Sequence, residues 1–267
     1  MKKLSIFAVA LAAVAFAACT GNKPQNEQNG TDSVKSFEQE QIEENIKVQM
    51  DSLAAEFGKL KALPILKDQN GNVILSDEEK QVKPDYLLNP SAIEDAITLP
   101  GKYRILSALS IDKQIAIAYD MPTDEYDEAI AKLSADINDP SFKVLDNTDS
   151  AFETSSKLYD AMEENGRINF FWQMAASALI EQLYITTQNT DKFIAAFDDN
   201  AAESVTYRIV LLQDAIERLS AYDPEIKPIS DAIEPLKVLN AITVDQFKSQ
   251  LEECKEQIAA SRKILLN

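Results

Sequence analysis

The chain has 267 residues, of which 44 are acidic and 26 are basic, giving a net charge of −18, and it contains no histidine. This charge excludes binding to nucleic acid or anionic lipid through a basic surface. The lack of histidine and the presence of only six glycines exclude serine triads, histidine-bearing zinc sites and glycine-rich phosphate loops.

The first eighteen residues have the pattern of a secretory signal peptide. Two lysines precede an uncharged stretch, Leu4 to Ala18, that is too short to span a bilayer comfortably. Residues 16–19 read FAAC and resemble a bacterial lipobox, in which small residues precede a cysteine that receives lipid. Residues 15–17 also satisfy the A-x-A rule of ordinary signal cleavage. We favour a signal peptide over 1–18 and palmitate on Cys19, which anchors the exported chain to a membrane.

A linker and then a helix are expected after Cys19. Residues 19–36 are polar, with a single aliphatic side chain, and so predict a flexible linker. From Phe37 to Leu60, apolar residues recur at steps of three and four, as in an amphipathic helix. Ser36 opens a capping box for this helix, and Pro64 ends it.

Two interpretations compete for the segment after that helix. Asp68, Asn70, Asn72 and the more distant Glu79 echo the alternating oxygen ligands of a calcium-binding EF-hand loop. Val73, however, stands where that loop needs glycine, and the Asn-Gly pair between two apolar runs indicates a tight hairpin turn. We favour one small β-hairpin near residues 65–75, keep calcium as the alternative, and expect no other metal and no cofactor.

The middle of the chain predicts three helices. Asn89 and Pro90 cap and open a short helix through Thr98, and a longer helix over 101–120 is apolar on nearly all sides. Thr123 opens an amphipathic helix that ends before Pro140. We expect one helical domain over 37–267, and the polar loop at 138–150 is where two half-bundles would meet.

The second half is also helical, so the fold class is all-α, a bundle of roughly eight to ten helices. Beyond a capping box at Ser150, the helices expected are 168–187, 190–197, 205–219 and a last one from Thr243, with Pro228 and Pro235 interrupting the chain before it. Cys254 lies on the apolar stripe of the last helix, which predicts a core position.

Glu181 is the single charge in the helix 168–187. Active sites gather acids in apolar surroundings, which makes Glu181 a candidate functional residue. A structural ion pair with Arg104, Lys113 or Arg208 explains it equally simply, and we favour that explanation. Trp172 in the same helix could line an apolar pocket, but aromatic residues at this spacing more often belong to the core.

The lipobox, the polar linker and the segment KPDYLLNP from Lys83 to Pro90 together resemble the uncharacterised helical lipoproteins of Bacteroidetes. The resemblance is specific for the export signal and general elsewhere. It implies an outer-membrane lipoprotein. The residue after Cys19 is not Asp, which agrees with outer-membrane sorting, and the missing acidic run after Cys19 favours the periplasmic face over the cell surface.

These observations predict a non-enzymatic binding or interaction module in the bacterial envelope. Its expected partners are the membrane, through lipid on Cys19, and another envelope protein, with no nucleic acid. The alternative is a ligand-binding protein or a carboxylate-dependent hydrolase, and enzymatic activity stays undecided. A deep pocket with converging acids would favour the alternative, whereas an exposed apolar patch would favour the module.

Overall fold

The computed structural model describes residues 37–60, 63, 65–68, 70–144 and 156–267, with side chains from residue 44 onward. The predicted signal peptide (1–18), Cys19, the linker and the caps at Ser36 and Ser150 lie outside the described residues. In chain order the α-helices are α1 (Phe37–Phe57), α2 (Asp77–Gln81), α3 (Leu99–Ala118), α4 (Asp124–Ile137), α5 (Ser156–Glu164), α6 (Ile168–Gln188), α7 (Thr190–Phe193), α8 (Asp199–Ser220), α9 (Lys227–Ile233), α10 (Val244–Glu253) and α11 (Lys255–Leu266). Four 3-10 helices join them: η1 (Pro90–Glu94), η2 (Pro140–Val144), η3 (Pro224–Ile226) and η4 (Glu234–Val238).

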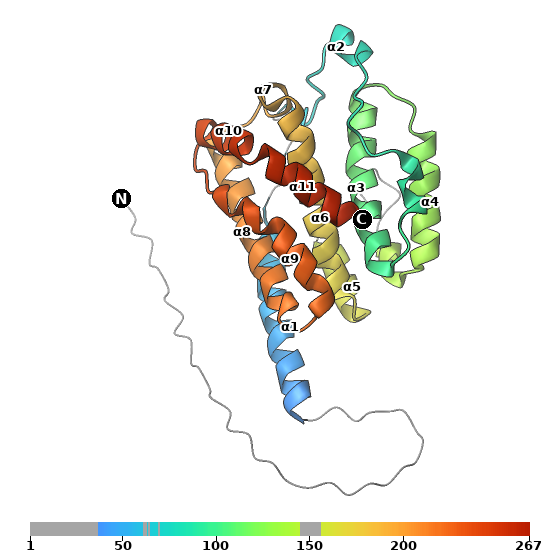
Figure 1. Ribbon diagram of the computed structural model, residues 1–267, viewed down its shortest axis with the longest axis vertical. Coiled ribbons are helices and arrows are strands. Elements are labelled where there is room, and N and C mark those ends of the chain that lie inside the picture. The colour runs from blue at the N-terminus through green and yellow to red at the C-terminus, as the bar shows by residue number, and fades with distance from the viewer. Residues whose placement is uncertain (1–36, 61–62, 64, 69, 145–155) are drawn as a thin grey trace, which may run out of the picture.

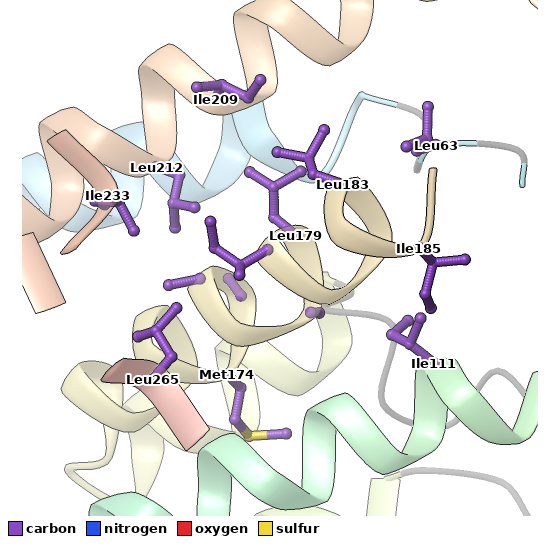
Figure 2. Packing of buried hydrophobic residues seen from close by; sticks show 14 of the residues in the cluster. Leu63, Ile111, Met174, Leu179, Leu183, Ile185, Ile209, Leu212, Ile233 and Leu265 are labelled. Atoms are coloured by element: carbon purple, nitrogen blue, oxygen red, sulfur yellow. The ribbon is translucent and has the colours of Figure 1, made fainter. Parts of the chain in front are cut away.

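The described part of the chain is therefore an all-α bundle, as predicted. Helix α6 runs through its middle, with α3 and α4 on one side and α8 and α1 on the other, while α11 crosses α6 (Figure 1). Nearly every residue of α6 after Phe170 is buried, which explains why its sequence carries one charge. Leu179 and Leu183 of α6 point toward Ile209 and Leu212 of α8 (Figure 2).

Some predicted boundaries move because a side chain caps a neighbouring helix. The predicted helix from Asn89 to Thr98 is only the 3-10 turn η1, capped by Asn89. The Thr98 side chain accepts a hydrogen bond from the Gly101 amide at 3.1 Å and starts α3. An N-cap residue takes an extended backbone, so Thr98 cannot also end the preceding helix. The predicted helix at 190–197 is likewise shorter, ending at Phe193.

The predicted last helix is two helices that meet at Cys254. The backbone of Cys254 has φ −103° and ψ 13°, outside the helical region, so α10 ends there and α11 begins. The break lets α10 pack against α7 and α8 while α11 turns onto α6 and α9. Cys254 itself is buried in the core, as predicted.

The predicted hairpin is reduced to one antiparallel bridge, between Lys67 and Val73. Leu66, just before it, has a positive φ of 56°, and its carbonyl accepts a hydrogen bond from the Ile74 amide at 3.0 Å. The segment therefore forms a tight turn without strands. No helix among the described residues is long and apolar enough to cross a membrane.

Candidate functional site

Two carboxyl groups and one guanidinium meet inside the bundle, contributed by three helices. Asp112 comes from α3, Glu181 from α6 and Arg262 from α11. Asp112 is 0% exposed and Glu181 is 1% exposed. We refer to Asp112 and Glu181 as the acid pair. Burying a charge is costly unless it is paired, so each group in this cluster needs a partner.

Arg262 binds Glu181 through two parallel hydrogen bonds. Nε donates to Oε2 and Nη2 donates to Oε1, each at 2.7 Å. The guanidinium also lies over the Tyr184 ring, 4.2 Å from its centroid. This planar, two-pronged geometry is the strong form of an ion pair. The structure confirms that Glu181 is buried, but the three partners expected for it were wrong, since its partner comes from the C-terminal helix.

Asp112 fastens a segment of irregular chain, residues 82–89, which we call the strap. Oδ2 of Asp112 accepts a hydrogen bond from the Leu88 amide at 2.6 Å. The Tyr126 hydroxyl of α4 donates to the Leu88 carbonyl at 3.1 Å. Both backbone groups of Leu88, which is itself half-buried, are thus hydrogen-bonded to buried side chains.

The charges of the cluster do not balance if both acids are ionised. Burial raises the pKa of Asp112 well above its ordinary range, and the neighbouring Glu181 raises it further, against the opposing effect of the Leu88 amide. Burial lowers the pKa of Arg262, but its hydrogen bond and ion pair with Glu181 outweigh this, so the net shift is upward. The cluster therefore stabilises one negative and one positive charge with Asp112 neutral.

The acid pair is a poor candidate for hydrolytic catalysis in this arrangement. A hydrolase with two carboxyl groups needs substrate or water between them. Here the two side chains are sealed from solvent and lie next to each other. The cluster can hold a proton and join helices, but it does not face a substrate.

Hydrogen bonds within the chain already engage Asp68, Asn72 and Glu79 among the calcium candidates. Oδ1 of Asp68 accepts from the amides of Asn70 and Asn72, both at 2.8 Å, and Oδ2 accepts from the Asn72 side chain at 3.0 Å. Glu79 instead accepts from the Ser76 amide at 2.8 Å in the capping box of α2. Among the described residues, no three His, Cys, Asp or Glu side chains are grouped to hold a metal ion.

Two surface hollows are lined mainly by polar residues. One, of about 550 Å³, lies beside α7 and is lined by Ile74, Glu79, Asn189, Asp191, Lys192, Ala195 and Ala196. Its charged groups are already paired, Glu79 with Lys192 at 3.3 Å and Asp191 with Lys248 at 2.7 Å. The other, of about 450 Å³, is a groove between α8 and the segment α9–η4, lined by Gln213, Glu217, Ser220, Ala221, Lys227, Ser230, Asp231, Ile233, Glu234 and Lys237.

Exposed apolar side chains continue this groove along α8. The Gln213 side chain donates to the Ile233 carbonyl and the Thr206 hydroxyl to the Ala241 carbonyl, both at 2.9 Å, so α8 runs alongside residues 233–241. Val210 lies on α8 between those two anchors, since helix positions three and four apart are neighbours. The exposed apolar residues of this region are Tyr207, Val210, Val238 and Ile242. We call these four residues and the adjoining groove the α8 face.

Trp172 and Cys254 belong to the core. Trp172 is 0% exposed and makes edge contacts with Phe57 and Phe171 at centroid distances of 5.4 and 5.3 Å. Its indole Nε1 is buried and has no hydrogen-bond partner within the described part of the chain. Burial raises the pKa of Cys254 to about 11, which keeps the thiol protonated and unreactive at neutral pH.

Asp112 was not predicted as a candidate residue, although the apolar helix around it offered a signal. The helix that carries it is apolar on nearly all sides, and an acid in such a helix must be buried. Glu181 was recognised for that same reason. Arg262 gave no comparable signal, because it lies 81 residues from Glu181 in a helix with many charges.

Comparisons with known proteins identify no relative of this chain. No family model matches it, and neither the curated proteins nor the solved structures contain a match. The likeness to the helical lipoproteins of Bacteroidetes therefore remains a prediction from the sequence. No functional residue is transferred from another protein, and function has to be inferred from the residues described above.

Proposed function

We propose that this protein is an exported, lipid-anchored module of the bacterial envelope that binds another protein through the α8 face. The observation that carries the proposal is the exposed apolar row beside the α8 groove. Val210 is 49% exposed, Val238 is 48% exposed and Ile242 is 63% exposed. An apolar patch with a polar rim is typical of a protein interaction site. In this proposal the domain has no catalytic role.

The charges around the α8 face indicate the kind of partner. Acids outnumber bases among the groove residues: Glu217, Asp231 and Glu234 stand against Lys227 and Lys237. Each of the two bases pairs with a groove acid, Lys227 with Asp231 and Lys237 with Glu234. The excess of acid favours a partner with an aliphatic ridge flanked by Lys or Arg. It disfavours a second copy of this acidic chain.

The predicted tether suits this surface. Helix α1, which follows the linker, packs along α8: Arg208 stacks over Phe57 at 4.0 Å, and Nη1 of Arg218 donates to Gln49 at 2.9 Å. A flexible linker over residues 19–36 would reach about 20–25 Å from the lipid. The proposed outer-membrane anchor, facing the periplasm, would thus keep the α8 face near partners in the same membrane and raise their effective concentration.

Photocrosslinking in cells tests the docking surface. A photoreactive amino acid replaces Val210 in one strain and, as the matched control, Ile97 in another. Ile97 is also an exposed aliphatic residue, but it precedes α3 in the chain, and α3 lies on the other side of α6 from α8 (Figure 1). We expect one discrete adduct from position 210 and none of that size from position 97.

The captured protein must then bind in purified form. Affinity should fall at least tenfold in Val210→Glu, because a charge enters an apolar contact, and should not change in Ile97→Glu. The affinity should also weaken with rising salt, because salt screens the attraction between the acidic groove of this protein and the basic residues of the partner. An adduct of two copies of this chain, or equal effects of the two substitutions, would refute the proposed partner.

The lipid anchor has its own test. Wild-type cells labelled with radioactive palmitate should yield a labelled protein in the membrane fraction, and Cys19→Ser should lose both the label and the membrane association. Cys254→Ser serves as the control cysteine and should keep the label. Equal labelling of wild type and Cys19→Ser would show that Cys19 is not the anchor.

A further inference from the structure

The acid pair lacks a hydrogen that its geometry requires. The buried carboxyl groups of Asp112 and Glu181 lie close enough for Glu181 to raise the pKa of Asp112 through its charge and through hydrogen bonding, yet two ionised carboxylates are acceptors only. Both oxygens of Glu181 are taken by Arg262, and Oδ2 of Asp112 accepts from Leu88. Oδ1 of Asp112 is buried and meets no donor among the described residues. A proton on Oδ1 would complete the contact by donating to Glu181.

We propose that Asp112 and Glu181 share one proton and so form a pH-responsive latch that closes α3 and the strap onto α6 and α11. The latch is closed while the proton is held. When the proton leaves, two buried negative charges face one guanidinium, and the end of the α3–α6 interface that carries the pair opens to water. The proposal does not depend on the function of the α8 face.

Among the described residues that shift the pKa of Asp112, the cation is Arg262. The groups that act on Asp112 are Glu181 from α6, Arg262 from α11, the Leu88 amide from the strap, and two tyrosine hydroxyls, Tyr126 from α4 and Tyr86 from the strap. Burial is the largest cause that raises the pKa of both tyrosines; Tyr119 also raises the pKa of Tyr86, and a negative charge on Asp112 raises both pKa values further. The tyrosines therefore remain neutral and do not compensate a lost proton.

The polar contacts between α3 and α6 explain why one end would open while the other stays closed. One helical turn or more before the acid pair, the Ser107 hydroxyl donates to the Met174 carbonyl and the Ser177 hydroxyl donates to the Arg104 carbonyl, both at 2.8 Å. These bonds join neutral groups and do not respond to pH in this range. They form the fixed end of the interface, and the acid pair with the strap forms the end that responds.

The direction of the pH effect follows from linkage. The pKa of Asp112 in the closed state is raised, so the latch is fully stable below the ordinary pKa of an aspartate, and its stability falls as pH rises toward the raised value. Over that interval the open-to-closed ratio increases about tenfold per pH unit, because opening releases one proton. The chain has no histidine, so no side chain with an ordinary pKa titrates between about pH 5 and 8. A slope in this window therefore identifies a perturbed group.

Hydrogen exchange on the full-length protein measures the latch. After correction for the intrinsic pH dependence of exchange, the Leu88 amide of the wild type should lose protection by about tenfold per pH unit above pH 5, until the raised pKa is passed. Asp112→Asn should abolish this slope, since an amide donates to Glu181 and accepts from Leu88 without titrating. The matched control is Asp139→Asn, at a buried acid that pairs with the Tyr103 hydroxyl. This variant should keep the wild-type slope.

Infrared spectroscopy of the wild type provides a second readout that needs no variant. The carbonyl absorption of a protonated carboxyl should be present at pH 6 and vanish as the exchange slope ends. Wild-type protection that is flat between pH 5 and 8 overturns the proposal, as does a slope that Asp112→Asn leaves unchanged. Should Asp112→Asn fail to fold, the absence of the infrared band at pH 6 would overturn it and its presence would support it.

Discussion

Arg262 is the residue on which the buried cluster most depends. Its two hydrogen bonds at 2.7 Å hold Glu181, which is 1% exposed, so removing the guanidinium leaves a carboxylate without a partner in the core. Breaking such a pair typically costs about 3–5 kcal/mol of folding free energy. A well-packed apolar replacement of all three charged groups could be neutral, which makes the loss of one partner the informative change.

We therefore expect Arg262→Met to lower the free energy of unfolding by about 3–5 kcal/mol at pH 7. The loss in Arg262→Lys should be smaller than in Arg262→Met but still measurable, since lysine keeps the charge but not the two-pronged geometry. Urea denaturation monitored by Trp172 fluorescence measures both. Arg218→Met, which removes an exposed pair with Asp214, is the control and should cost at most about 1 kcal/mol. Equal losses in Arg262→Met and Arg218→Met would contradict the assigned role.

Single residues were predicted well from the sequence when burial alone decided their place. Glu181 and Cys254 stand on apolar helices, and both are buried. Partners were predicted poorly, because the pairing of Glu181 with Arg262 depends on how α11 crosses α6, which no local pattern encodes. Local structure also accounts for two of the calcium candidates, since Asp68 accepts hydrogen bonds within its own turn and Glu79 caps a helix.

At the scale of elements, caps decide where helices begin. Thr98 and Thr123 both occupy N-cap positions, of α3 and α4 respectively. The Thr98 side chain accepts from the Gly101 amide at 3.1 Å, whereas Thr123 makes no such cap bond. The two threonines occupy equivalent positions, but only Thr98 stabilises the start of its helix through a cap hydrogen bond.

Replacing each threonine with alanine measures that difference. Thr98→Ala should lower the free energy of unfolding by about 1 kcal/mol, because the N-cap hydrogen bond is lost. Thr123→Ala should change it by less than about 0.5 kcal/mol, because it removes a surface side chain without a cap bond. Thermal denaturation of both variants decides, and a larger loss in Thr123→Ala than in Thr98→Ala would contradict the role given to the cap.

Helix identity followed from periodicity, while helix ends depended on tertiary structure. The helix predicted from Thr123 to just before Pro140 and the helix predicted at 168–187 correspond to α4 and α6, since their apolar residues repeat at the helical period over many turns. No glycine or proline marks the point in the sequence where the last helix divides, at Cys254. Packing of α10 and α11 against different partners requires the break, and that requirement is not local.

At the scale of the whole molecule, the buried acid pair and the exposed α8 face lie in separate places in the bundle. The acid pair lies inside, where it joins α3, α6 and α11. The α8 face lies outside, next to the helix that the predicted tether enters. The sequence predicted the helical bundle and the tether, but it could not indicate the α8 face, because that face forms only where α8 packs beside η4.

Lipid anchoring and docking through the α8 face make one joint prediction, which the crosslinking yield from position 210 tests in living cells. The adduct should form in the membrane fraction of the wild type and fall at least tenfold when Cys19→Ser removes the lipid, since the tether supplies the effective concentration. The strains with and without Cys19 must contain equal amounts of the protein. An adduct from position 210 that is equally abundant without Cys19, or that forms equally from position 97, would contradict this account.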